Sequence, residues 1–336
     1  MCVHDWTLTG LNAQIDITQY WLALNCLVSH IGLDDWASLS ALKYRRLVPH
    51  SVRLVHERFQ KVGSQQEWLQ NKLTETRVVA QLLYAQVLYK AAERMYQRVL
   101  VGYGKALGLD NPWTLDTVNI LGSLYRDQGK LTEAERMYQR ALTGKELTLG
   151  LDHPLIFDTV NNLGLLYQVQ DRLTKAEQMY QRALAGNEKA LGPCPSTLSI
   201  VNNLGILYQG QGKLVEAEQM YVRALTGFEK ELGPGHTSTL TTVSNLGILC
   251  QSQGKPSKAE QMYQRALAGK EKALGQDHTS TLETTNNLGL LYQSQGKLAE
   301  AEQMYQRVLA GYEKASLLYT IPALNTVKNL GVLGTG

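Results

Sequence analysis

Phenylalanine and cysteine are scarce in this 336-residue chain, with three and four residues, whereas tyrosine occurs 17 times. Cys2, Cys26, Cys194 and Cys250 share no CxxC spacing, which fits a reducing compartment better than a disulfide framework. The most apolar stretch, residues 20–28, is too short to span a bilayer, and no charged segment leads into an apolar run at the N-terminus. We therefore expect a cytoplasmic protein that does not bind membranes.

An excess of one charge is also lacking. The 33 basic and 30 acidic residues give a formal net charge of +3, and no clustered basic face for nucleic acid is indicated. With 44% hydrophobic residues, the chain can bury a large core. The sequence thus indicates a protein that does not bind nucleic acid.

Internal repetition dominates the rest of the sequence. The string Ala-Glu-x-Met-Tyr occurs with its Ala at positions 92, 134, 176, 217, 259 and 301. The pair Leu-Gly occurs in phase with it, with its Leu at positions 121, 163, 204, 246, 288 and 330. Both strings recur at steps of 41 or 42 residues, so the chain is an array of repeats.

Each unit contains two expected helices, as the segment from Thr114 to Gly150 illustrates. Apolar and small residues at positions 118, 121, 122 and 125 share one face of a first helix, and those at 131, 134, 138, 141 and 142 share one face of a second. Gly129 stands between them, where a helix C-cap needs a left-handed residue. Pro154 prevents the second helix from continuing. Each unit is therefore predicted to be a helical hairpin.

Small residues allow the two helices of a hairpin to approach closely. Gly164 of one helix and Ala176 of the other are placed to make that contact, and Tyr180 would fill the wider part of the gap. Because one hairpin cannot bury its apolar face alone, the hairpins must stack on one another.

The spacing of Leu163, Gly164, Tyr167, Ala176 and Tyr180 resembles the tetratricopeptide repeat signature. The period of 42 and the linkers at 150–154 and 275–279 resemble those of the kinesin-light-chain class. The resemblance covers residues 76–336, as one degenerate unit, five regular units and a terminal half unit. It implies an all-α fold, a right-handed α-solenoid of antiparallel helix pairs (the tetratricopeptide superhelix), preceded by a small helical segment. It also implies binding of a protein or peptide partner.

The first unit departs from this pattern. Ala80-Gln81 is expected to replace the Leu-Gly pair, and the turn over residues 85–91 is expected to be shorter than in later units.

Residues 1–75 lie outside the period and contain four of the five tryptophans. The order of Val3, His4, Asp5 and Trp6 ahead of such repeats resembles the end of the nucleotide-binding region in fungal NLR-like proteins, which join an NB-ARC domain to repeats. The resemblance implies that His4 and Asp5 sense a nucleotide's phosphate in the winged-helix part of such a domain. It also implies a contact between the array and that domain within one polypeptide.

The chain has no phosphate-binding loop of its own. Six Gly-Lys pairs occur, and none is followed by Ser or Thr as such a loop requires. We therefore expect no nucleotide or other cofactor to be bound by this chain.

Catalysis and metal binding are not indicated either. His153, His236 and His278 recur in the linkers between units, where repetition separates them in space and rules against a shared metal site. We interpret them as polar residues that help to start the next helix. We expect no enzyme activity and no metal.

The candidate binding residues form a second stripe on the first helix of each unit, facing away from the core. The stripe comprises Asn119, Arg126, Asn161, Leu165, Gln168, Asn202, Ile206, Gln209, Ser244, Gln251, Asn286 and Gln293. Amide side chains can both donate to and accept from the backbone of an extended peptide. The apolar members, with Ile248 and Leu290, favour a peptide with hydrophobic anchors. Arg126 and Lys328 are its only basic members, so no clamp for an acidic C-terminus is indicated.

Three functions remain open from the sequence. The array is interpreted as a protein-binding scaffold, the sensor arm of an NLR-like protein. A cargo adaptor of the kinesin-light-chain kind and a purely architectural spacer are the alternatives. The stripe would also be explained as a solvated face of recently copied repeats.

Overall fold

The computed structural model describes residues 66–85, 87–314 and 321–333, which form thirteen helices and no strand. In chain order they are α4 (Gln66–Ala85), α5 (Tyr89–Leu107), α6 (Pro112–Asp127), α7 (Leu131–Leu149), α8 (Pro154–Val169), α9 (Leu173–Leu191), α10 (Pro195–Gly210), α11 (Leu214–Glu231), α12 (Thr237–Ser252), α13 (Pro256–Leu274), α14 (Thr279–Ser294), α15 (Leu298–Lys314) and α16 (Ile321–Leu333). His4 and Asp5 lie outside the described residues.

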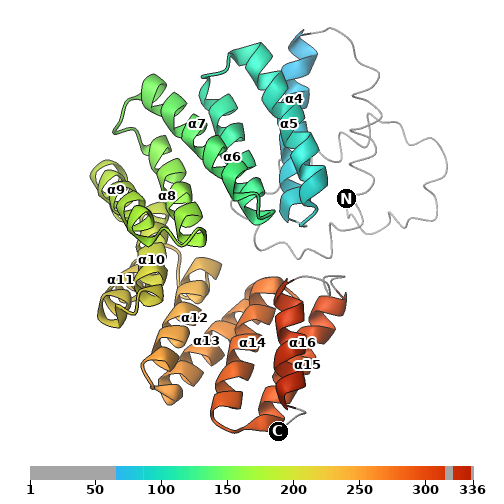
Figure 1. Cartoon of the computed structure of the whole chain (residues 1–336), viewed down its shortest axis with the longest axis vertical. Coiled ribbons are helices and arrows are strands. Elements are labelled where there is room, and N and C mark those ends of the chain that lie inside the picture. The colour runs from blue at the N-terminus through green and yellow to red at the C-terminus, as the bar shows by residue number, and fades with distance from the viewer. Residues whose placement is uncertain (1–65, 86, 315–320, 334–336) are drawn as a thin grey trace, which may run out of the picture. The chain divides into compact units, whose positions relative to one another are not determined.

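Helices that are consecutive in the chain pack against each other, most extensively within the pairs α4–α5, α6–α7, α8–α9, α10–α11, α12–α13 and α14–α15 (Figure 1). Each pair also packs on the next, and α16 stands at the end as a half unit. The fold of the described residues is therefore the predicted all-α solenoid of helix pairs. Below, the even-numbered helices are called first helices and the odd-numbered ones second helices.

Side chains in the linkers fix where most first helices begin. The imidazole Nδ1 of His153 accepts a hydrogen bond from the backbone N–H of Leu155 at 3.3 Å. In the same way, Nδ1 of His236 accepts from the N–H of Ser238, and Nδ1 of His278 accepts from the N–H of Ser280, both at 3.2 Å. Asn111 caps α6 in the same way, with its Oδ1 accepting from Trp113 at 3.0 Å. These bonds satisfy backbone donors that a helix start leaves unpaired. The interpretation of the three histidines as helix-starting residues is confirmed.

The turn inside each hairpin is tight. Gly129 has a φ of 75°, and the Lys130 N–H donates back to the Tyr125 carbonyl at 2.8 Å, which closes the end of α6 as predicted.

A tyrosine ring packed on a glycine brings the two helices together in the five units from α6 to α15. Tyr138, Tyr180, Tyr221, Tyr263 and Tyr305 of the second helices are at most 1% exposed. Each ring lies against the glycine of the Leu-Gly pair in its own unit, and a Cβ on Gly205 would lie 2.6 Å from the Tyr221 ring. Since real Cβ atoms do not approach other atoms so closely, an alanine in place of Gly205 would force the Tyr221 ring to shift.

The first unit is more regular than its sequence indicated. Val79 and Ala80, both buried, stand 42 residues before Leu121 and Gly122, whereas Gln81 is exposed. The connection from Ala85 to Tyr89 spans the same number of residues as that from Asp127 to Leu131. The expected Ala80-Gln81 replacement and the shortened turn were therefore wrong. The helix α4 begins at Gln66 and runs across the expected boundary between residues 75 and 76.

Two glycines of α10 test the tyrosine contact. We expect Gly205→Ala to lower the free energy of unfolding by about 1–3 kcal/mol, because the new methyl group meets the Tyr221 ring. Gly210→Ala is the matched control, since a Cβ there meets nothing within 4 Å. It should leave stability unchanged or raise it by up to about 1 kcal/mol through helix propensity. Urea denaturation followed by circular dichroism measures both, and equal effects would contradict the close-contact argument.

Candidate functional site

The predicted stripe runs along the first helices α6, α8, α10, α12 and α14. Consecutive first helices touch one another, so equivalent positions of neighbouring units lie side by side. The stripe consists of three rows: asparagines, aliphatic residues and glutamines. These rows differ in how much of each side chain is available to a ligand.

The aliphatic row, Leu165, Ile206, Ile248 and Leu290, is the most open to a ligand. Ile206 is 38% exposed and Ile248 is 37% exposed, and the other two are half-buried. Ser123 stands at the equivalent position of α6. These partly exposed aliphatic side chains offer a ligand apolar contact along the array without forming a deep pocket.

The asparagine row is an intramolecular ladder. The amide nitrogen of Asn203 donates to Oδ1 of Asn161 at 3.0 Å, and the same bond joins Asn162 to Asn119 at 3.3 Å and Asn245 to Asn202 at 3.1 Å. At the end of the array, the Thr326 hydroxyl donates to Oδ1 of Asn286 at 3.1 Å. Each bond joins one first helix to the next. These asparagines therefore also hold neighbouring units together.

The glutamine row faces the second helices. Oε1 of Gln168 accepts from the Tyr180 hydroxyl at 2.9 Å, as do Gln209 from Tyr221, Gln251 from Tyr263 and Gln293 from Tyr305, at 2.8 to 3.2 Å. The buried tyrosines thereby satisfy their hydroxyl groups at the edge of the candidate face.

These bonds change what the amides offer. The Oδ1 and Oε1 atoms of both rows accept bonds from inside the array. Among the described residues, the amide nitrogens of Asn161, Asn202 and Gln168 make no hydrogen bond. We expected each amide to offer a peptide both a donor and an acceptor. Because the amide oxygens are already bonded within the array, the N–H groups are what these side chains offer, and they suit the backbone carbonyls of a ligand.

Ser244 does not belong to the exposed face. Its side chain is 5% exposed, its hydroxyl donates to the Leu240 carbonyl at 3.2 Å, and it lies 3.3 Å from the Thr284 hydroxyl. The prediction of Ser244 as a ligand contact is corrected, because a side chain shorter than asparagine turns inward and interrupts the ladder.

The asparagine directly before the Leu-Gly pair was missed in four units. Asn162, Asn203, Asn245 and Asn287 lie on the same helical face as the aliphatic row, three residues before it. These asparagines were visible in the sequence, but periodicity alone does not tell which of two adjacent residues faces a ligand.

The charge of the face is neutral to acidic. Arg126 is the single basic residue of α6, α8, α10, α12 and α14, and it pairs with Asp127 at 2.9 Å. Asp158 and Glu283 are exposed on the same helices. A strongly acidic ligand would find no free cation in these helices.

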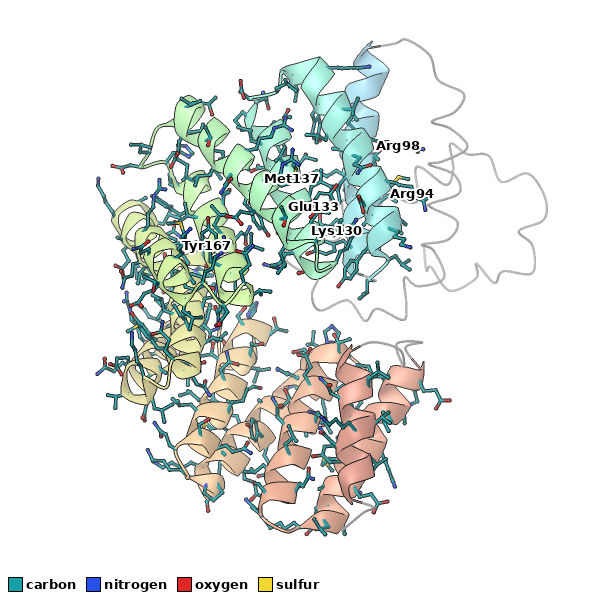
Figure 2. All side chains as sticks on the ribbon, in the orientation of Figure 1. Arg94, Arg98, Lys130, Glu133, Met137 and Tyr167 are labelled. Atoms are coloured by element: carbon teal, nitrogen blue, oxygen red, sulfur yellow. The ribbon has the colours of Figure 1, made fainter. Side chains whose placement is uncertain are left out.

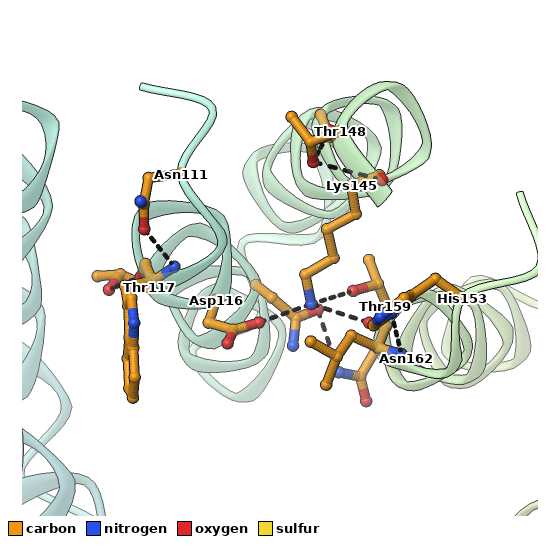
Figure 3. A network of polar contacts seen from close by, with 12 residues as sticks. Asn111, Asp116, Thr117, Lys145, Thr148, His153, Thr159 and Asn162 are labelled. Atoms are coloured by element: carbon orange, nitrogen blue, oxygen red, sulfur yellow. Dashed lines mark hydrogen bonds and ion pairs between the residues drawn. The ribbon is translucent and has the colours of Figure 1, made fainter. Parts of the chain in front are cut away.

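Asp116, the remaining carboxylate of these helices, pairs with a buried lysine (Figure 3). Lys145 of α7 is 2% exposed, and its ammonium lies 2.6 Å from Oδ1 of Asp116. The same ammonium donates to the Leu155 carbonyl at 3.0 Å and to the Thr159 hydroxyl at 3.3 Å, both in the next unit. This cation therefore serves the junction between two units.

The position of Lys145 varies from unit to unit although it is buried in all of them. Its occupants are Tyr103, Lys145, Asn187, Phe228, Lys270 and Tyr312, each at most 5% exposed. The tyrosine and Leu-Gly positions are nearly uniform by comparison. The six junctions between successive units therefore carry different buried side chains, although the units are otherwise nearly identical.

Ion pairs join successive second helices on the opposite side of the array. Arg182 pairs with Glu146 at 2.5 Å, and the equivalent pairs are Arg223–Glu188, Arg265–Glu229 and Arg307–Glu271. Nearer the turns, Lys130, which directly precedes α7 and is labelled in Figure 2, pairs with Glu93 of α5 at 3.2 Å. Because most of these groups are partly exposed, each pair contributes at most about 1 kcal/mol.

The described residues contain no cluster of three His, Cys, Asp or Glu side chains that could hold a metal ion. None of their helices is long and apolar enough to cross a membrane.

The tetratricopeptide repeat profile matches residues 73–147, 116–189, 155–230 and 196–272, and a second profile of the same description matches 281–316. The chain belongs to the tetratricopeptide repeat family. None of the curated proteins compared with it matches.

Solved structures with the same fold include BtubC (BKLC) from P. vanneervenii, with a TM-score of 0.52, 22% identity, and coverage of 76% of this chain and 93% of that one. A single-residue variant of a Podosopora anserina putative kinesin light chain with nearly identical TPR-like repeats has a TM-score of 0.50 and 23% identity. That match covers 61% of this chain and 97% of the other. At these identities the likeness is one of fold alone.

Lys270 is a buried lysine that we expect to make the stability of the tetratricopeptide array depend on pH. Its ammonium is 3% exposed and faces the Thr284 hydroxyl at 2.9 Å, the Ser244 hydroxyl at 3.3 Å and the Ser280 carbonyl at 3.4 Å. Burial lowers the pKa of this lysine from 10.5 to about 8, and the negative charge of Glu283 opposes that change only in part. Below about pH 8 the folded chain carries a buried charge that the unfolded chain solvates, so stability rises as the pH increases from about 8 to 10.5.

We expect Lys270→Met to raise the free energy of unfolding at pH 7 by roughly 1–3 kcal/mol and to remove most of that rise with pH. Ser244 and Thr284 keep their bonds to backbone carbonyls in this variant. Lys145→Met is the control, because Lys145 pairs with a carboxylate and its loss should not stabilise the protein. Urea titrations at pH 7, 9 and 10 measure both, and a destabilised Lys270→Met variant at pH 7 would refute the argument.

Proposed function

We propose that this tetratricopeptide protein binds an extended segment of a partner protein along the exposed face of its first helices. Tetratricopeptide arrays are protein-interaction scaffolds, and this face supplies what such a ligand requires. The aliphatic row offers apolar contact at steps of one unit, and the flanking amide groups offer donors for backbone carbonyls.

The observation that carries the proposal is the exposure of Ile206 and Ile248 on neighbouring first helices. The equivalent positions of four successive units are all aliphatic, whereas most of the surrounding exposed residues are polar. The face has almost no free basic residue, so the partner segment is apolar with neutral or basic flanks rather than acidic.

A peptide selection tests this proposal. We expect a displayed random-peptide library, panned on the full chain, to yield peptides with spaced apolar residues and without acidic enrichment. Ile206→Asp/Ile248→Asp should weaken binding of the best peptide by at least about tenfold in a fluorescence polarization titration, because buried anchors dominate binding energy. The matched control is Val215→Asp/Val222→Asp on α11, whose side chains are 67% and 50% exposed on a second helix. An unproductive selection, or equal losses in the two variants, would favour an architectural spacer.

We further propose that the array is the ligand-reading arm of an NLR-like protein, with His4 and Asp5 as nucleotide-sensing residues. This role is supported by the order of Val3, His4, Asp5 and Trp6 ahead of the tetratricopeptide units. It requires a nucleotide-binding domain on the same polypeptide, which would contact the array.

The size of the native polypeptide tests the sensor role. An immunoblot of source cells with an antibody against the repeats should show a band much larger than the 37.4 kDa calculated for this chain. A band near that mass would refute the sensor role and leave the peptide-binding proposal untouched.

A further inference from the structure

The first-helix face has an apolar edge on α6 and α8 that α10, α12 and α14 lack. Trp113 is 53% exposed and Leu155 is 41% exposed, and both stand near the start of their helices. The later helices hold serines at the same position: Ser196, Ser238 and Ser280. On α8 the edge continues the face already described, since Asn162 follows Leu155 by seven residues and Leu165 follows it by ten.

A carboxylate, Asp158, stands between this apolar edge and the asparagine of α8. It comes three residues after Leu155 and four before Asn162, on the same side of the helix. Its side chain is exposed and makes no hydrogen bond or ion pair with the described residues. At this point the face therefore offers a ligand an anion beside apolar surface.

Asp158 lacks a partner because the buried position in its unit holds no lysine. In the preceding unit, the ammonium of Lys145 lies 2.6 Å from Asp116 (Figure 3). One unit later, Asp158 takes the place of Asp116, but Asn187 takes the place of Lys145. The amide nitrogen of Asn187 is buried without a hydrogen-bond partner, so it does not bond Asp158 either.

The charges between α6 and α8 do not balance. Desolvation by the packed helices raises the pKa of Asp158, Lys145 lowers it, and the charge of Asp116 raises it again. Lys145 is already in an ion pair with Asp116. Two carboxylates thus share one ammonium, and a cation supplied by a ligand would favour the ionised form of Asp158.

Glu283 holds the position of Asp158 on α14, but its surroundings differ. Burial raises the pKa of Glu283, and the nearby charge of Lys270 opposes that change. The ammonium of Lys270 makes hydrogen bonds to two hydroxyl groups and a backbone carbonyl, not to another carboxylate. One carboxylate and one ammonium balance here, and Ser280 replaces the apolar edge. The excess negative charge and the apolar edge therefore coincide on α8 and not on α14.

The indole of Trp113 is held in place by the neighbouring first helix. The guanidinium of Arg77 in α4 lies over the ring, 5.3 Å from its centroid. Since this contact orients the ring before a ligand arrives, Trp113 loses little conformational freedom on binding. Arg77 is not among the charges that shift the pKa of Asp158.

We propose that the partner segment carries an arginine or lysine that pairs with Asp158, next to an apolar side chain that packs on Trp113 and Leu155. The aliphatic stem of the basic residue packs on the apolar edge while its charged end reaches the carboxylate. The proposal rests on the peptide-binding function proposed above and names the residue that sets its charge specificity. It places the basic residue at the α6–α8 end of the segment, with the other apolar anchors toward Ile206 and Ile248.

The test uses peptides selected from the displayed library on the full chain. We expect one arginine or lysine at a fixed distance from the apolar residues. Asp158→Asn should weaken binding of such a peptide by at least about tenfold in fluorescence polarization, because a charge-assisted pair is lost. Glutamine in place of the basic residue should weaken binding to the wild type equally. It should have no effect on binding to Asp158→Asn, since both changes remove the same pair.

Two controls are matched to the two parts of the site. Glu283→Gln removes the carboxylate at the same position of α14 and should change the affinity by less than about twofold. Leu155→Ser copies the residue of the later units and should weaken binding by at least about fivefold. Leu151→Ser, at a residue 64% exposed in the linker before α8, should leave binding unchanged. Circular dichroism checks that each variant folds.

The outcomes distinguish this proposal from the one on which it rests. Peptides that depend on Ile206 and Ile248 but carry no basic residue would overturn the pairing with Asp158 and leave the binding face intact. Equal losses in Asp158→Asn and Glu283→Gln would also overturn it, because they indicate a general effect of charge. An unproductive selection would overturn both proposals.

Discussion

The contact of a buried tyrosine ring with a glycine on the facing helix is the constraint on which the array depends. It sets the separation of the two helices, so it also sets how far each first helix stands from the next unit. The tyrosine hydroxyl then reaches the glutamine row, where Gln168 and its equivalents accept from it. One aromatic residue per unit thus connects the core to the candidate binding face.

Above this core, bonds of two kinds join neighbouring units. Asparagine amides join the first helices, and arginine–glutamate pairs join the second helices. The asparagine bonds lie beside the aliphatic row, so a ligand on that row rests on a surface that is already hydrogen-bonded across units. This reduces the conformational freedom that binding would otherwise have to remove.

Most of the fold was predictable because its determinants are local. The helix pairs, the Gly129 turn and the histidines that start helices follow from residues a few positions apart. The details of the site were less predictable, because they depend on bonds between residues 42 or 43 positions apart, such as Asn203 to Asn161. Ser244 shows what repeat position alone cannot predict. Its position in the repeat predicted an exposed side chain on the face, but this short side chain turns inward toward Thr284, beside Lys270.

The buried position occupied by Lys145, Asn187 and Phe228 in successive units bears on how such an array can change length. Loss of residues 154–194 by recombination would preserve the period but place α7 against α10. Lys145 would then face Ile200 in place of Thr159, and a buried cation would lose a hydrogen-bond partner. Near-identical units are therefore not interchangeable, and their order is itself heritable information that selection can act on.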